Sequence, residues 1–131
     1  MIGLKVKTVN ETKKVANKAK QASITSLSHA GGAIRLTASR SIKSRKGPAP
    51  PGHPPHTHTR RLPKAIQYAV EPRRQVVVIG PNVQHFGTAG AAHEFGGRFR
   101  GAYYEKRPFM RPALEKIKSR LPAFWRNSIR R

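Results

Sequence analysis

Apolar residues near the end of the chain follow a helical period. Four of them are spaced by four, three and four residues, which places them on one face of an α-helix: Met110, Leu114, Ile117 and Leu121. Pro112 suits the first turn of this helix, where a backbone N–H is not needed. Because Pro122 disfavours a further helical turn, we predict that the helix ends near Leu121 and that residues 123–125 form a turn or a re-angled end.

A longer helical pattern fills the first third of the chain. Small and aliphatic residues keep helical spacing from Val9 to Ile42, in a stretch without proline. We predict a helix over residues 8–46, beginning at a capping-box pair, Thr8 and Glu11. Residues 1–7 are predicted as a short strand or an arm.

Gly31-Gly32 interrupts this pattern and costs about 1 kcal/mol per glycine relative to alanine. One bent helix and a pair of consecutive helices both fit the sequence. Because the apolar stripe is narrow and made mostly of small residues, the helix would be marginal alone, which favours packing against a sheet or a neighbouring subunit.

The middle of the chain contains one clear strand pattern. The run Gln75–Ile79 is apolar after its first residue, which predicts a strand buried on both faces in the middle of a sheet. Residues 60–68 are predicted as a short helix, and residues 83–92 as a loop rich in glycine and alanine. The aromatic segment Phe99–Tyr104 is predicted as a strand or a hairpin arm.

A proline-rich segment, GPAPPGHPPHTHT, occupies residues 47–59. Its five prolines remove backbone donors and favour extended geometry. It is too short for a domain linker, so we expect a functional or subunit-contacting loop. The chain is therefore predicted as a single domain over residues 1–131, with sheet and helices in residues 60–121 and a basic C-terminal tail over residues 122–131.

The charge balance is extreme. There are 27 Lys and Arg residues against 5 acidic residues, a net charge of +22, and every acidic residue is Glu. Such a charge opposes compaction of an isolated chain and favours a polyanionic or acidic partner. The absence of Cys excludes disulfides and thiol catalysis. No apolar run is long enough to span a membrane, so we expect no membrane partner.

Candidate chemistry is sparse. His53, His56 and His58 lie close in sequence, but the prolines around them hinder wrapping of one ion and no carboxylate is near, so we expect no metal. His93 and Glu94 have no neighbouring nucleophile or second carboxylate, so we expect no catalysis and no cofactor. Glu94 is instead predicted as an ion-pair or capping partner in a subunit contact.

Several spaced segments together resemble one protein family. They are PGHPPHTHTRRLPKAI (51–66), VVVIGPN (76–82), HEFGG (93–97) and RPFMRPALE (107–115). In this order they are similar to the signatures of the neck, or tail-completion, proteins of long-tailed double-stranded DNA bacteriophages. Tail-morphogenesis proteins of Mu-like phages share a similar His…Phe-Gly-Gly pattern.

The resemblance implies an α+β domain: a small, mostly antiparallel sheet flanked by the long N-terminal helix and a C-terminal helix. It implies a virion structural protein without catalysis that forms a ring, six-fold or twelve-fold, at the head–tail junction. The implied partners are other neck proteins, such as a tail terminator, head-closure or adaptor protein, with non-specific contact to packaged double-stranded DNA. The implied location is the virion neck, with the host cytoplasm during assembly.

Two other classes of protein are less consistent with the sequence. A basic RNA-binding protein of ribosomal type would explain the charge, but it would not explain the ordered motifs, and the chain has no RNA-recognition signature. A nuclease would need a carboxylate cluster for metal, and five scattered Glu residues do not supply one.

Candidate contact residues follow from these interpretations. Aromatic residues beside arginine are enriched at interface hot spots, and Phe95, Phe109, Met110 and Leu114 are expected in the core. Candidates for the subunit or neck-partner interface are Pro51, His53, Pro54, Pro55, His56, Glu94, Tyr103, Tyr104, Arg107, Phe109, Arg111 and Trp125. Candidates for contact with nucleic acid or an acidic partner are Lys13, Lys14, Lys18, Lys20, Arg35, Arg40, Lys43, Arg45 and Lys46.

Overall fold

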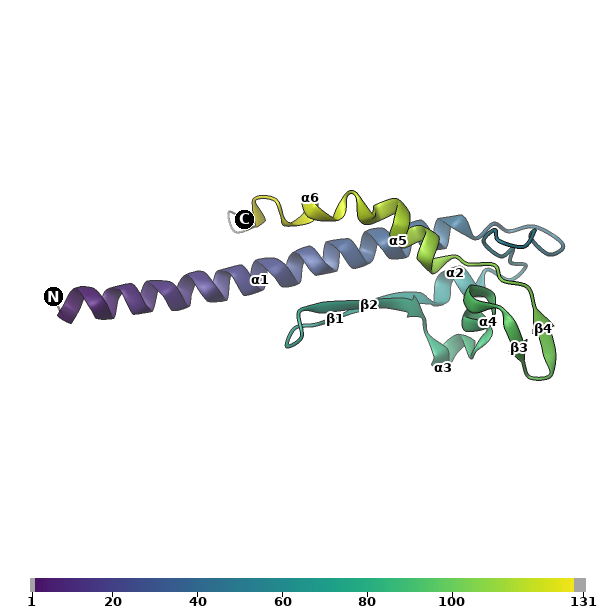
Figure 1. Ribbon diagram of the computed structural model, residues 1–131, viewed down its shortest axis with the longest axis horizontal. Helices are drawn as coiled ribbons and strands as arrows, with labels where there is room; N and C mark the ends of the chain where they lie inside the picture. The colour runs from purple at the N-terminus through teal and green to yellow at the C-terminus, as the bar shows by residue number, and fades with distance from the viewer. Residues whose placement is uncertain (1, 129–131) are drawn as a thin grey trace.

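The computed structural model describes the backbone of residues 2–128 and the side chains of residues 12–84 and 87–128. The fold is α+β, built from one long helix, two separate two-stranded antiparallel sheets and several short helices (Figure 1). In chain order the elements are α1 (Ile2–Ser41), α2 (Arg61–Ala65), β1 (Ile66–Glu71), β2 (Val76–Pro81), α3 (Val83–Phe86), α4 (Ala89–Phe95), β3 (Gly97–Phe99), β4 (Ala102–Tyr104), α5 (Met110–Lys118) and α6 (Leu121–Trp125).

Helix α1 is the axis of the molecule. Its 40 residues span about 60 Å at 1.5 Å per residue, and its N-terminal half extends beyond the other elements (Figure 1). The predicted strand or arm over residues 1–7 is wrong, because α1 already begins at Ile2. The predicted end at residue 46 is also wrong, because α1 ends at Ser41 and residues 42–46 lead into the proline-rich loop.

The pair Gly31-Gly32 lies inside a continuous helix because a β-hairpin packs against it. A Cβ atom built on Gly31 would lie only 2.7 Å from Tyr68 Cδ2 and 2.8 Å from Val77 Cγ2. The Tyr68 hydroxyl also lies 3.1 Å from Ser28 Oγ, one turn earlier on α1. Close approach of the hairpin therefore offsets the low helix propensity of the glycines.

The hairpin consists of β1 and β2, with Tyr68 opposite Ile79 and Val70 opposite Val77. Its inner face covers α1, and its outer face is open to solvent, so that Val78 is 57% exposed. The prediction that this strand lies buried in the middle of a sheet is therefore wrong. β2 has one partner strand, and α1 covers only one of its faces.

Two local assignments also differ from the sequence prediction. The helix predicted over residues 60–68 ends at Ala65, and Ile66 starts β1. The loop predicted over residues 83–92 contains α3 and α4. Asn82 caps α3, since its side-chain oxygen accepts a hydrogen bond from the Gln84 N–H at 2.9 Å.

The main core lies where α1, α2, β1 and α5 meet. Its buried residues are Ile34, Ala38, Ile42, Leu62, Ile66, Phe109, Ala113 and Ile117. Helices α5 and α6 return along α1 on the side away from the hairpin (Figure 1). The predicted C-terminal helix is confirmed up to Lys118, and residues 123–125 form part of α6, so the re-angled end is the correct alternative.

The proline-rich loop is held against the body by several hydrogen bonds. Thr57 N–H donates to the Lys43 carbonyl at 2.9 Å, and Gly52 N–H donates to the Lys106 carbonyl at 2.8 Å. Arg107 Nε donates to the Ala49 carbonyl at 2.7 Å. The loop therefore packs beside the segment that links the β3–β4 hairpin to α5. That hairpin spans residues 97–104, so the predicted segment Phe99–Tyr104 contains its turn and its second strand, and the hairpin-arm alternative is confirmed.

Within the described part of the chain, no helix combines the length and the apolar character needed to span a membrane.

Candidate functional site: an apolar groove beside a capped helix

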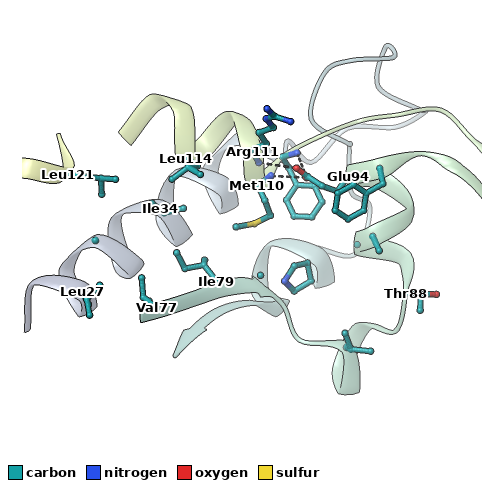
Figure 2. A pocket seen from close by; sticks show the side chains of 18 of the residues that line it. Leu27, Ile34, Val77, Ile79, Thr88, Glu94, Met110, Arg111, Leu114 and Leu121 are labelled. Atoms are coloured by element: carbon teal, nitrogen blue, oxygen red, sulfur yellow. Dashed lines mark hydrogen bonds between the residues drawn. The ribbon is translucent and has the colours of Figure 1, made fainter. Parts of the chain in front are cut away.

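A single carboxylate caps the start of α5. Glu94, on α4, accepts backbone hydrogen bonds from Phe109 N–H at 2.8 Å and Met110 N–H at 2.9 Å through Oε2, and from Arg111 N–H at 3.0 Å through Oε1 (Figure 2). A negative charge at this position also complements the positive end of the helix dipole. Glu94 thus caps a helix of its own chain, while its place in a subunit contact stays a prediction.

Beside this cap lies an apolar groove of about 870 Å³. It is walled by α1, by β2, by the α3–α4 region and by α5 and α6, and Figure 2 shows Leu27, Ile34, Val77, Ile79, Met110, Leu114 and Leu121 around it. Its volume is typical of sites that bind a drug-sized ligand or a small apolar surface. The groove therefore has the size and character of a binding site.

Large apolar side chains stand exposed at the edges of the groove. Phe95 is 74% exposed, Val83 is 66% exposed and Leu114 is 42% exposed, and all three belong to its lining. The prediction that Phe95 and Leu114 lie in the core is wrong. Phe95 is the last residue of α4, and no element of the described chain covers it. Exposed apolar side chains gathered around a groove are typical of interaction sites.

The charged groups in the groove lining differ in availability. Glu94 is fully engaged by the α5 backbone. The Arg111 side chain is exposed. It forms no ion pair within the described residues, where the one salt bridge joins Arg74 to Glu71. Lys118 is not part of the lining, but it is exposed and lies two turns beyond Arg111 on the side of α5 that carries Leu114. The α5 edge of the groove therefore presents free positive charge.

His93 lies behind the groove in a buried, cationic setting. Burial lowers the pKa of its imidazole below the usual 6.5, and the nearby positive charge of Arg107 lowers it further. Its Nδ1 is buried and has no hydrogen-bond partner among the described residues. Its carbonyl accepts a hydrogen bond from Arg107 N–H at 2.7 Å, which joins α4 to the segment before α5.

The predicted interface residues are not equally accessible. Pro51, His53, Tyr103 and Tyr104 are exposed; Pro54, His56, Arg107 and Trp125 are half-buried. Pro55 and Phe109 are less than 2% exposed in this chain, so the structure does not place them on a surface where a partner could contact them; Phe109 packs in the core.

The predicted basic contact residues also differ in how exposed they are. Lys13, Lys14, Lys18 and Lys20 are exposed along the projecting half of α1, and Arg40, Lys43, Arg45 and Lys46 are exposed at its other end. Arg35 differs from them, because it is half-buried and its Nε donates to the Ile66 carbonyl at 2.8 Å. It therefore has a structural role in attaching the hairpin to α1.

Two histidines of the proline-rich loop lie near backbone carbonyl groups of the same loop. His53 Nδ1 lies 3.4 Å from the Pro51 carbonyl oxygen, and His56 Nδ1 lies 3.3 Å from that of Gly47. In the part of the chain that the structure describes, no group of three or more His or Glu side chains is placed to hold a metal ion.

The groove itself is a feature that the sequence analysis missed. Its lining comes from five separate segments, and the apolar spacing of α5 does not reveal which of its residues remain exposed.

A scan against protein-family models, a search of curated proteins and a search of solved structures found no match to this chain.

Proposed function

We propose that this protein is a structural component of a bacteriophage neck. In this role it forms a ring, six-fold or twelve-fold, and completes the joint between head and tail without catalysing a reaction. Its partners are other neck proteins, such as a tail terminator, head-closure or adaptor protein. It acts in the virion neck after assembly in the host cytoplasm.

The observation that carries the proposal is that the motif segments form one connected framework. Asn82 N–H donates to the Ala65 carbonyl, which joins the second segment to the first. Glu94 caps the helix that begins in the fourth segment, and Arg107 N–H donates to the carbonyl of His93. The motif segments are far apart in sequence, yet hydrogen bonds join them in the folded chain. Their joint occurrence in one order is therefore consistent with a shared fold, which supports the resemblance to the neck-protein family.

The shape of the molecule also favours a role in assembly. The N-terminal half of α1 projects from the body (Figure 1), and the groove exposes apolar residues at its edges. A chain with these features leaves apolar surface that a monomer does not bury, and such surface favours association. Proteins that build larger particles need surface of this kind.

A second candidate function is binding of RNA or another polyanion. The exposed lysines along α1 and the net charge of +22 favour it. Phosphate contacts would make binding fall steeply with salt. The two candidate functions predict different oligomeric states after purification in high salt: a defined oligomer for a virion protein and a monomer for an RNA-binding protein.

Light scattering coupled to size exclusion, at 0.15 M and 0.5 M salt, tests the proposal. After removal of nucleic acid with salt and nuclease, we expect a defined oligomer that negative-stain electron microscopy shows as a ring. A monomer that retains RNA at low salt and never forms a ring, alone or with isolated tails, would contradict the neck function and support the second candidate.

A further inference from the structure

We propose that the groove between α5 and the α3–α4 region binds an amphipathic helix of a different protein, with an apolar face and acidic flanks. The inference deepens the proposed function, on which it rests, by giving the chemistry of one neighbouring protein. It is carried by the apolar groove lining, the free positive charge at the groove edge and the charge of the whole chain.

The apolar part of the argument comes from the groove lining. Phe95 and Leu114 are exposed residues of the lining, and Ile79 and Met110 are partly buried residues of the same lining. A row of apolar residues along one helix face fits such a groove, as in other helix-in-groove complexes. The N–H groups at the start of α5 are already bound by Glu94. The helical walls α1 and α5 bond their own backbones, and β2 contributes the apolar side chains of Val77 and Ile79 to the groove (Figure 2). A helix that satisfies its own backbone and presents an apolar face is therefore the fitting occupant.

The charge of the groove edge selects acidic flanks. Arg111 belongs to the groove lining, and Lys118 lies two turns further along the same side of α5, beyond Leu114. Neither cation forms an ion pair within the described residues. The one acidic group of the groove lining, Glu94, is occupied by backbone donors. A partner with Glu or Asp beside its apolar face would pair with the two free cations, and a basic partner would be repelled.

The same electrostatics argue against a second copy of this chain as the occupant. The chain carries +22, and the acidic residues outside the cap and the Arg74 ion pair are Glu11, Glu105 and Glu115. Its longest helix carries many lysines along the projecting half. Docking of that helix beside Arg111 would bring like charges together, which is unfavourable at ordinary salt.

Fluorescence anisotropy with synthetic helices tests the inference on the full-length protein. The probe is an 18-residue labelled peptide with Leu at positions i, i+3, i+4 and i+7 and Glu on the flanks. Matched probes replace the flanking Glu with Lys, replace Leu with Ala, or place two prolines in the centre. We expect the Leu/Glu helix to bind at least about tenfold more tightly than each matched probe.

Variants locate the binding surface. Leu114→Glu is expected to weaken the Leu/Glu probe by about tenfold or more, whereas Val78→Glu, on the exposed outer face of the hairpin, should leave its affinity within about twofold. Both side chains are exposed, so both variants should fold, and circular dichroism checks this. The double variant Arg111→Glu/Lys118→Glu should reverse the preference and bind the Leu/Lys probe more tightly than the Leu/Glu probe.

Several outcomes would overturn the inference. Equal binding of the proline-containing probe would show that the occupant is an extended peptide and not a helix. If the charge-reversed double variant still prefers the Leu/Glu probe, acidic flanks on the partner are not what the groove recognises. Self-association of the purified protein that Leu114→Glu abolishes, without probe binding, would make a second copy the occupant. The peptide assay and the ring assay are separate measurements, so a failure of probe binding is distinguishable from a failure of ring formation.

Discussion

At the level of single residues, Glu94 decides how the C-terminal helix begins. The sequence predicted a capping or ion-pair role for it but could not name the backbone groups that it binds. Those groups belong to residues 15 to 17 positions later in the chain. Only the packing of α4 against the start of α5 brings the carboxylate to them.

Replacement of Glu94 by alanine should therefore destabilise the protein. The change leaves three backbone N–H groups without an acceptor, and loss of a helix cap with such groups costs about 1–3 kcal/mol. Urea unfolding of Glu94→Ala measures this loss. The matched control is Glu105→Ala, an exposed Glu whose removal should change the free energy of unfolding by less than about 0.5 kcal/mol. Equal effects of both substitutions would show that the cap contributes nothing specific.

His93 should make stability depend on pH. Because the pKa of His93 in the folded protein lies below 6.5, the unfolded chain binds a proton more readily than the folded one. The free energy of unfolding should therefore fall as the pH is lowered through 6.5 toward the folded pKa, and become constant with respect to this group below that value. Urea unfolding between pH 7.5 and pH 5 measures the effect.

The control for this prediction is a matched pair of variants. His93→Gln should flatten the decline on the acidic side, whereas His58→Gln, at an exposed position of the loop, should leave the decline as it is in the unmodified protein. A decline that is identical in both variants would assign the pH effect to general charge repulsion in this basic chain.

The two adjacent glycines of α1 should respond in opposite ways to alanine. A Cβ on Gly31 would clash with Tyr68 and Val77, so Gly31→Ala should cost about 1–3 kcal/mol. A Cβ on Gly32 has one neighbour, Tyr68 Cε1 at 3.9 Å, so Gly32→Ala should stabilise the helix by up to about 1 kcal/mol. Thermal unfolding compares the two, and a stabilising Gly31→Ala would mean that the hairpin does not approach α1 closely.

At the level of elements, hydrophobic periodicity predicted α5 and most of α1 because helix spacing is a local property. It failed for β1. Ile66, Tyr68 and Val70 alternate with Gln67, Ala69 and Glu71, which is a strand pattern, and the segment pairs with β2 in the antiparallel hairpin. The pattern is only six residues long and directly follows a helical segment, so its first residues were assigned to that helix.

The C-terminal helix α6 should contribute to stability although none of its residues is fully buried. The buried Ser26 hydroxyl donates to the Phe124 carbonyl at 2.8 Å, and Phe124 packs against the core. A chain that ends at Arg120 should lose about 2–4 kcal/mol of unfolding free energy through lost packing and one buried hydrogen bond. A chain that ends at Asn127 is the control and should unfold like the complete chain in the same calorimetric scan.

At the level of the whole molecule, the charge is distributed over both ends of α1. Among the described side chains, four exposed lysines lie on the projecting half, and four exposed basic residues lie at the other end beside the proline-rich loop. If the projecting half of α1 contacts packaged DNA, removing its lysines should weaken DNA binding more than removing the same number of positive charges at the other end of α1. The sequence alone gives the size of the charge but not this difference in position.

Substitution of Lys13, Lys14, Lys18 and Lys20 by Gln should lower the salt dependence of DNA binding. Four lost phosphate contacts reduce the slope of log K against log salt by about 3 to 4. The matched variant carries Gln at Arg40, Lys43, Arg45 and Lys46 and loses the same net charge. Filter binding over a salt series measures both slopes, and equal reductions would assign DNA binding to net charge without a preferred surface.

The sequence by itself determined that long helical segments lie in the first third and near the end of the chain and that the chain is strongly basic, because these follow from local spacing and from composition. The α+β class, which the structure confirms, was implied by the resemblance of the spaced motifs, and Phe99–Tyr104 was predicted as a strand or a hairpin arm. Tertiary structure decided that Gly31-Gly32 stays helical, that β2 lies in a two-stranded hairpin, that Glu94 caps α5 and that Phe95 and Leu114 edge an open groove. Each of these depends on contacts between residues far apart in the chain, and burial is set by what packs over a side chain rather than by its own hydrophobicity.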